Sequence, residues 1–324
     1  MATEKGRPLA VVAVLAAAAC WATTGTTVVL SLGNVEIDGV TLCLARAGTA
    51  TALVWFWLGL SRRDLLRLAP GEWVGLAGYG LWAVTLFYIA TIYGIAGTSA
   101  SVGITLLYVA PALVTLGGAV WLGEPLSRGK LAALALSFGG VLLVVRAFSP
   151  ATLAGTPAGV AWALLAGVAY AGYSLFGKRL LARHRPQTVL AWYLLFGTLG
   201  LVAVKLIVSP GSWPPVSQLA AIALGLGVVT TLLPTSLYLF ALTRLPSSEA
   251  SILASIEPVV AVALAAVVLG ERLDPAQAAG AGAVVGGVIL LNVHRPGERG
   301  RRERQTRPDS MPEPRREGRP AEGG

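Results

Sequence analysis

The chain alternates long apolar segments with short polar ones. Each apolar segment holds about 20 residues, and a helix of that length spans ~30 Å of hydrocarbon. The apolar and polar alternation that marks the strands of a membrane barrel is absent from the sequence. The pattern therefore predicts an all-α integral membrane protein with ten transmembrane helices. These are expected at residues 9–30, 40–60, 73–94, 99–121, 129–147, 158–177, 187–207, 218–241, 248–269 and 275–293.

The composition agrees with this pattern. Hydrophobic residues make up 55% of the 324 residues and charged residues 13%, whereas a soluble domain has about 25% charged residues. Between Trp73 and Gly123 the sequence has no Asp, Glu, Lys or Arg. This run is too long for one helix, and we expect the segment GIAGTSAS (94–101) to form the turn between two spans.

The positive charges predict the orientation. Lys and Arg gather in cytoplasmic loops, and a cytoplasmic N-terminus places there all of the 25 Lys and Arg residues except Arg46, Arg146, Lys205 and Arg272. Both termini are therefore expected in the cytoplasm. The net charge of +9 reflects this bias, so nucleic acid is not an expected partner. Residues 295–324 lack apolar periodicity, and we expect them to form a disordered basic cytoplasmic tail.

Residues that bind metals or catalyse reactions are scarce. Cys20 and Cys43 are too few for a disulfide framework or a four-thiolate site, and His184 and His294 have no second histidine at metal-binding spacing. The sequence has no phosphate-binding glycine loop and no nucleophile elbow. We therefore expect neither enzyme activity nor a metal or other cofactor.

The sequence contains an internal repeat. The segment LYVAPALVTLGGAVWLGEPL (107–126) aligns with ASIEPVVAVALAAVVLGERL (254–273), and Pro111 then matches Pro258. Each half has five helices, and because five is odd the second half enters the membrane in the opposite orientation. Two inverted five-helix repeats are an architecture typical of secondary transporters. The expected repeats are residues 1–147 and 148–294.

One segment of each half carries a family resemblance. The segments are TSASVGITLLYVAPALVTLGGAVWLGEPLS (98–127) and LPSSEASILASIEPVVAVALAAVVLGERL (245–273). They resemble the signature segments of the EamA family in the drug/metabolite transporter superfamily, and the resemblance extends over residues 9–293. It implies a ten-span secondary transporter of bacterial inner membranes that exports amino acids, related metabolites or drugs and is coupled to the proton gradient. The second half matches more closely, because Ala110 stands opposite Glu257.

Glu257 lies near the middle of an apolar span, beside Pro258. An ionisable side chain deep in a bilayer costs several kcal/mol and is tolerated where it faces a wet cavity or a partner. Such a carboxyl can exchange protons at cellular pH, or it can join helices by hydrogen bonds, and both roles stay open. Pro258 bends its helix in either case, and Pro111 and Pro234 are expected to bend theirs.

Arg46 is the other charged residue well inside a span. At 1.5 Å per residue it lies ~9 Å from the outer end of its helix, and Glu257 lies ~14 Å from the inner end of its own. In a ~30 Å core these depths differ by ~7 Å, which permits an ion pair. An ion pair, extension of the arginine to the interface and a role in substrate binding or gating all stay open.

Aromatic residues, several at repeat-related positions, are candidates for the wall of a central cavity. Ordinary packing or anchoring at the membrane interface explains each of them equally well. The candidates are Trp21, Trp82, Tyr88, Tyr108, Tyr170, Tyr173 and Tyr238.

Small residues four positions apart occur in helices five and ten. They lie in the segments ALSFG (135–139) and GAVVG (282–286). This spacing permits close approach of two helices. It serves either packing within the bundle or a homodimer through helices five and ten.

Together these patterns predict a secondary active transporter that works by alternating access. We expect it to export small metabolites, such as amino acids or related amphipathic compounds, in exchange for protons at Glu257. A small-molecule substrate and the lipid bilayer are the expected partners. An uncoupled facilitator or importer is one alternative, and a non-transporting membrane sensor or scaffold is another.

Overall fold

The structure is a computed structural model that describes residues 6–32, 37–98, 100–148, 155–211, 224–268, 270 and 274–293. Every regular element within these ranges is a helix. The tail expected over residues 295–324 lies outside the described residues.

The first half forms five spans. One helix makes the first, second and fifth spans, whereas the third and fourth are built from consecutive shorter helices. The elements are α1 (Arg7–Leu32), α2 (Gly39–Ser61), η2 (Arg63–Leu66), α3 (Glu72–Gly80), η3 (Leu81–Leu86), α4 (Phe87–Gly97), α5 (Ala100–Leu107), α6 (Ala110–Leu122) and α7 (Arg128–Val144).

The second half repeats this plan. Its third and fourth spans are again composed of consecutive shorter helices. The elements are α8 (Pro157–Leu181), α9 (Pro186–Val208), η5 (Gly225–Leu232), α11 (Leu233–Leu242), α12 (Ser247–Ala254), α13 (Glu257–Val268) and α14 (Pro275–Val293).

Nine helices in the described ranges are long and apolar enough to cross a membrane. The tenth expected span is α7, whose 17 residues reach the lower end of the usual length of about 17–25 residues. The prediction of an all-α integral membrane protein is therefore confirmed. The chain is a multi-pass membrane protein.

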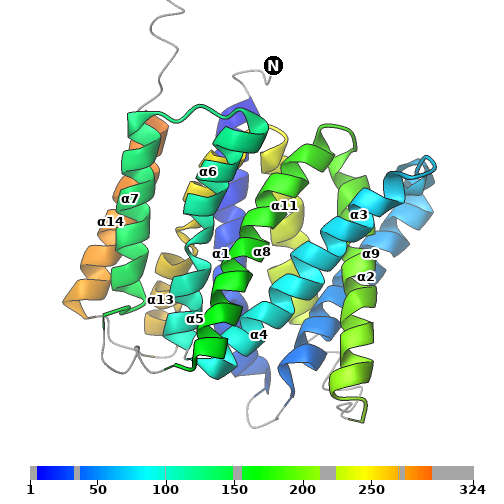
Figure 1. The fold of residues 1–324 in the computed structure, drawn as a ribbon, viewed down its shortest axis with the longest axis horizontal. Coiled ribbons are helices and arrows are strands. Elements are labelled where there is room, and N and C mark those ends of the chain that lie inside the picture. Colours follow the sequence, from blue (N-terminus) through cyan, green and yellow to red (C-terminus); the bar gives the residue numbers. More distant parts are fainter. Residues whose placement is uncertain are drawn as a thin grey trace, which may run out of the picture.

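The two halves run in opposite directions through the bundle. In Figure 1 α1 descends from the top, next to the N-terminus, whereas α8 begins at the bottom and rises. The odd number of spans in the first half produces this inversion. We call the face at which α1 begins, at the top of Figure 1, the N-side, and the other face the opposite side.

The third and fourth spans of each half are interrupted at related places. In the third span of each half a π-helix, η3 or η5, replaces the α-helix. In the fourth span two residues separate α5 from α6, and two separate α12 from α13. Interruptions free backbone groups, which inside a membrane must be paired within the protein or face a wet cavity.

Prolines follow three of these interruptions directly. Pro111, Pro234 and Pro258 are the second residues of α6, α11 and α13. Proline has no N–H, and the first turn of a helix does not use that group, so proline is well tolerated there. The three prolines thus begin new helical segments where the sequence predicts bends.

The fifth spans of the two halves, α7 and α14, pack closely through small residues. A Cβ added to Gly140 would lie 2.7 Å from the Gly280 carbonyl oxygen. This face of the two helices is therefore used within the chain. Gly139 and Gly282 have nothing within 4 Å of an added Cβ in the described part of the chain, and a homodimer through these helices stays a prediction.

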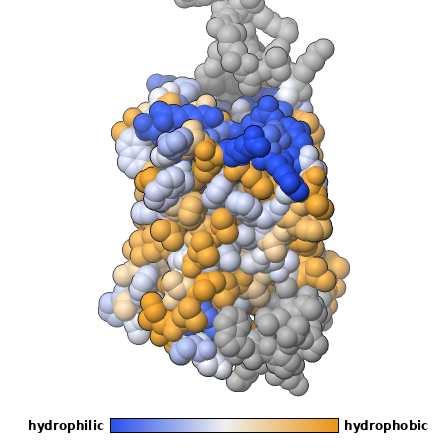
Figure 2. All heavy atoms as spheres, turned by 90° about the vertical axis from the view of Figure 1, so that its right-hand side faces the viewer, coloured by the Kyte–Doolittle hydropathy of each residue, from blue (hydrophilic) through white to orange (hydrophobic). Residues whose placement is uncertain are grey.

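The outer surface of the bundle is apolar around its middle. Large exposed side chains of the outer surface include Phe56, Val120, Ile207 and Val267, with exposed fractions of 68%, 77%, 80% and 84%. Figure 2 shows one such face, with hydrophilic residues gathered at the N-side end and apolar residues across the middle. This distribution is the one expected of a surface in contact with lipid tails.

A buried ion pair joins the two halves on the opposite side. The Lys205 side chain is 0% exposed and its Nζ lies 2.9 Å from Asp38 Oδ2. Asp38 also caps α2, because its Oδ1 accepts from the Thr41 N–H at 2.9 Å. Burial alone would raise the pKa of Asp38, but the hydrogen bonds from Thr41 and Lys205 outweigh it and lower the pKa from 3.8 to about 2.

Replacing Asp38 by Asn should destabilise the protein markedly. The change removes the negative charge beside the buried Lys205 ammonium, which also donates to Ser209 Oγ at 3.0 Å. We expect a loss of roughly 3 kcal/mol, since breaking a buried pair costs about 3–5 kcal/mol and Asp38 is partly exposed. Thermal unfolding in detergent, followed by tryptophan fluorescence, measures the change. The matched control is Asp64→Asn, which breaks the exposed pair with Arg62 and should cost less than about 1 kcal/mol.

The same pair predicts a pH dependence. Since folding lowers the pKa of Asp38, its stabilisation is complete above about pH 4 and is lost as the pH falls toward about 2. The difference in melting temperature between the wild type and Asp38→Asn should shrink over that interval. Equal melting temperatures of Asp38→Asn and Asp64→Asn at neutral pH would contradict the assignment.

Candidate functional site

A cavity of about 290 Å³ lies inside the bundle and is lined by helices of both halves. Most of its lining residues are apolar or aromatic. The polar and charged side chains on its wall, apart from the tyrosines, come from Thr24, Cys43, Arg46, Thr91, Thr231, Thr235 and Glu257. A mostly apolar pocket with a few convergent polar groups is the common form of a small-molecule site.

Arg46 is fixed in the cavity wall by the interrupted third span of the second half. Its Nη2 donates to the Thr230 carbonyl oxygen at 2.8 Å and its Nε to Thr231 Oγ1 at 2.9 Å. Thr230 and Thr231 belong to the π-helix η5, and Pro234, four residues after Thr230, has no N–H to donate to the Thr230 carbonyl. The guanidinium also lies 4.9 Å from the centre of the Tyr88 ring, a cation–π distance. These contacts hold the charge at the cavity rather than at the interface.

Glu257 occupies the interruption of the fourth span of the second half. It is the first residue of α13 and follows the break after α12. Its carboxyl lies near the side chain of Tyr108, a residue at the matching break between α5 and α6. The two interrupted spans therefore meet at this carboxyl.

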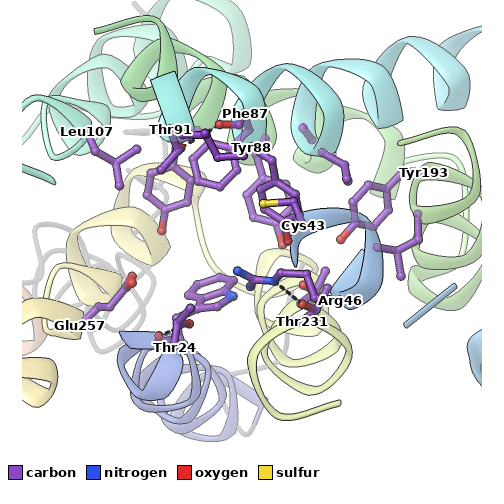
Figure 3. Close-up of a pocket in the computed structure, with 18 of the residues that line it drawn as sticks. Thr24, Cys43, Arg46, Phe87, Tyr88, Thr91, Leu107, Tyr193, Thr231 and Glu257 are labelled. Carbon is purple, nitrogen blue, oxygen red and sulfur yellow. Dashed lines mark hydrogen bonds between the residues drawn. The ribbon is translucent and has the colours of Figure 1, made fainter. Parts of the chain in front are cut away.

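Arg46 and Glu257 extend into the cavity from different sides (Figure 3). No ion pair within 4.0 Å joins them among the side chains that the structure describes. A molecule bound between them can therefore contact a positive and a negative group at the same time.

Aromatic rings form another part of the wall. Tyr170 packs against Phe87 with ring centres 5.8 Å apart and against Tyr173 at 6.3 Å. Tyr170 is 8% exposed, and its hydroxyl has no hydrogen-bond partner among the described residues. A buried hydroxyl without a partner costs free energy, so a ligand or water that bonds it would stabilise this arrangement.

Four of the seven aromatic candidates line the cavity, namely Trp21, Tyr88, Tyr170 and Tyr173. Three lie outside its wall. Trp82 donates its indole N–H to the Ala169 carbonyl at 3.1 Å, Tyr108 contacts Glu257 from a second apolar cluster, and Tyr238 is 0% exposed and bonded to Ser174 at 2.8 Å.

The bundle is closed between the cavity and the N-side. Tyr238, Leu242 and Leu245 are each 0% exposed, and Tyr238 stacks on Tyr173 and packs against Trp21 at a tilted angle. On the opposite side the cavity includes Cys43 and Arg46, near the start of α2. The cavity therefore lies toward the opposite side, and the N-side is sealed.

Sequence reasoning missed several residues of the site. Thr231 and Thr235 have no charge and sit in an apolar run, and Cys43 resembles an ordinary core residue. The Thr-Thr pair at 230–231 gave no clear signal, because the first span contains two such pairs, at 23–24 and 26–27. Its meaning depends on the π-helix, which periodicity does not reveal.

Two inverted five-helix halves with interrupted helices around a charged cavity define an inverted-repeat membrane transporter. Comparison with known proteins gives the family. The chain belongs to the EamA-like transporter family, which it matches twice, over residues 8–146 and 157–293.

Several relatives carry names that fit this family. An uncharacterized transporter of Archaeoglobus fulgidus is 27% identical over 278 residues, 83% of this chain and 92% of that protein. A probable terminal-alkyne amino-acid exporter of Streptantibioticus cattleyicolor is 27% identical over 84% of this chain and 89% of its own length. The threonine/homoserine exporter RhtA of Escherichia coli is 37% identical over 129 residues, 39% of this chain and 42% of RhtA.

A solved crystal structure has the same fold. It superposes with a TM-score of 0.75, covers 89% of this chain and 97% of its own, and is 21% identical. At that identity the likeness concerns the fold alone.

The closed N-side predicts unequal access to two engineered thiols. In a chain with both native cysteines replaced by serine, Thr91→Cys on the cavity wall should react readily with a charged, membrane-impermeant maleimide. Ser251→Cys, at a position 2% exposed in α12, should react about tenfold more slowly or less, because it is reached only through an opening of the bundle. Labelling of purified protein measured by mass shift tests this, and equal rates would contradict the closed N-side.

Proposed function

We propose that this protein exports small zwitterionic molecules, amino acids or close relatives, in exchange for protons by alternating access. The observation that carries the proposal is the placement of Arg46 and Glu257 on one small cavity, with opposite charges and with aromatic rings between them. We further propose that it resides in a bacterial inner membrane with both termini in the cytoplasm.

The cavity suits a molecule with two charged ends. Arg46 offers a planar guanidinium that pairs well with a carboxylate, and Glu257 can accept from an ammonium group. A volume of about 290 Å³ is at the lower end of ligand pockets, which measure about 300–1,000 Å³. A small solute fits this space better than a large amphipathic drug. The rings of Tyr170 and Trp21 would contact the rest of the molecule.

Proton coupling follows from competition at one carboxyl. Glu257 either carries a proton or accepts from the substrate's ammonium, and the two states exclude each other. Proton binding from the side with higher proton activity would then release the substrate there. An ionisable group in the membrane interior is often part of such a relay.

The orientation and the direction of transport have separate support. Lys and Arg favour the segments on the N-side, as the positive-inside rule requires of the cytoplasmic face. The cavity would then face the exterior in this structure, which is the state that releases an exported molecule. The names of two relatives, as exporters of threonine and homoserine and of an alkyne amino acid, support amino acids as the first substrates to test.

Replacing Glu257 by Gln should abolish the effect of a pH gradient on transport. Purified protein in liposomes with an acidic lumen should take up labelled threonine or homoserine faster than without a gradient, and Glu257→Gln should show equal rates in both conditions. Glu72→Gln serves as the matched control, because Glu72 is exposed at the start of α3 and should leave the stimulation unchanged. A wild type without stimulation would favour an uncoupled facilitator instead.

Thr231→Val should weaken substrate binding, whereas Thr230→Val should not. The first change removes the oxygen that accepts from Arg46 Nε, and the second retains the carbonyl that accepts from Nη2. Hydrogen bonds to charged groups contribute about 1.5–3 kcal/mol, so we expect the half-saturating concentration to rise about tenfold for Thr231→Val. Uptake at varied substrate concentration measures it, and identical behaviour of the two variants would show that Thr231 does not position Arg46.

A further inference from the structure

A carboxylate of the first half holds the start of a helix of the second half on the N-side. Glu124 lies in the turn between α6 and α7, and its Oε1 accepts from the N–H and the hydroxyl of Ser247, both at 2.6 Å. Its Oε2 accepts from the Ser248 N–H at 3.1 Å and from the Ser248 hydroxyl. Ser247 and Ser248 are the first two residues of α12.

Glu124 acts as the missing cap of α12. The residue at the N-cap of this helix is Pro246, which makes no side-chain cap hydrogen bond, so the first N–H groups of α12 depend on a distant acceptor. A negative charge at a helix N-terminus is also favoured by the helix dipole. Burial alone would raise the pKa of Glu124, but the hydrogen bonds from Ser247 and Ser248 lower it below the ordinary 4.5. The carboxylate is thus ionised and fully engaged.

Two glycines in and before the turn that carries Glu124 allow its side chain to reach across to the second half. Gly123 ends α6 with a φ of +66°, a left-handed conformation that favours glycine. A Cβ on Gly118 would lie 2.9 Å from Glu124 Oε2, so only a glycine leaves room for the carboxylate there. The two glycines direct Glu124 across the interface between the halves.

Charged side chains of three other helices also contact the start of α12 or the residues just before it. Lys130 of α7 donates to Ser248 Oγ at 2.9 Å. Arg7 of α1 pairs with Glu249 of α12 at 2.5 Å. Lys178 of α8 donates to the carbonyl oxygens that precede α12, those of Leu242 at 2.5 Å and Leu245 at 2.8 Å. The start of α12 is therefore tied by charge to α1, α7, α8 and the α6–α7 turn.

The helix α12 connects these contacts directly to the cavity. α12 has eight residues, about 12 Å of helix, and Glu257 follows the two-residue break at its other end. A shift of α12 away from Glu124 would open the closed N-side and would move the backbone next to Glu257. The break beyond Ala254 allows α12 to move without α13.

We propose that Glu124 and the Ser247–Ser248 pair form a gate that keeps the N-side closed while the cavity faces the opposite side, and that this gate opens when the cavity turns to the N-side. The proposal rests on the proposed function only in requiring two alternating states. In this proposal Glu124 controls access from the N-side and does not contact the substrate.

The test uses the thiol reporters Thr91→Cys and Ser251→Cys in the full-length chain without native cysteines. Adding Glu124→Gln removes the charge that holds α12. We expect labelling of Ser251→Cys by a charged maleimide to accelerate about tenfold or more, the change that a loss of about 1.4 kcal/mol produces. Labelling of Thr91→Cys should slow, because the opposite side closes as the N-side opens. Glu72→Gln, an exposed carboxylate on the same side, should change neither rate.

A purely structural role of Glu124 gives a different result. In that case Glu124→Gln would lower the melting temperature and accelerate both reporters together, and this outcome overturns the proposal, as does an unchanged rate for Ser251→Cys. If Glu124→Gln does not fold, the double variant Ser247→Ala and Ser248→Ala keeps the backbone donors and should shift the two reporters in the same opposed directions. Since labelling needs neither substrate nor a pH gradient, opposed shifts with no amino-acid transport would support the gate and reject the proposed substrate.

Discussion

The structure depends on one constraint, that no charge or free backbone group inside lipid can be left without a partner. Arg46 meets this constraint through Thr231 and through the Thr230 carbonyl, which Pro234 leaves without its usual helical donor. An arginine in a span and a helix with a displaced hydrogen-bond pattern are both unfavourable in lipid. Here each supplies the hydrogen-bond partner that the other needs. The pair costs less than either would alone and leaves the remaining guanidinium donors facing the cavity.

The same reasoning explains why the interrupted helices gather at the centre. A two-residue break in a lipid-facing helix would expose backbone groups to hydrocarbon, whereas the breaks before α6 and α13 meet at Glu257 and Tyr108. Duplication of a five-helix unit with inversion brings the breaks of both halves to the same depth. The charged cavity therefore follows from the repeat, because each half contributes an interrupted helix and the other half shields that interruption from lipid.

Much of this could be predicted from the sequence. Length and apolarity predicted the spans, of which nine are long apolar helices in the described residues, and the internal repeat between residues 107–126 and 254–273 predicted the inverted halves. Trp21, Arg46, Tyr88, Tyr170, Tyr173 and Glu257 line one cavity, whereas Trp82, Tyr108 and Tyr238 lie outside its wall. The rotation of a helix about its own axis determines whether its aromatic residues face the cavity. An apolar span has too few polar positions for the sequence to predict this rotation. The π-helix and the role of Thr231 depend on hydrogen-bond register, which leaves no mark in hydropathy.

The role of Glu124 could not be predicted from the sequence, since a carboxylate at the end of a span resembles an ordinary interface residue. Its partners lie more than 120 residues further along the chain, by separations of 123 and 124. During synthesis the first half therefore enters the bilayer with this charge still hydrated at the surface, and the cost of dehydrating it arises only when the second half arrives. Burial of the Glu124 carboxylate therefore belongs to the assembly of the two halves and not to the membrane insertion of the first.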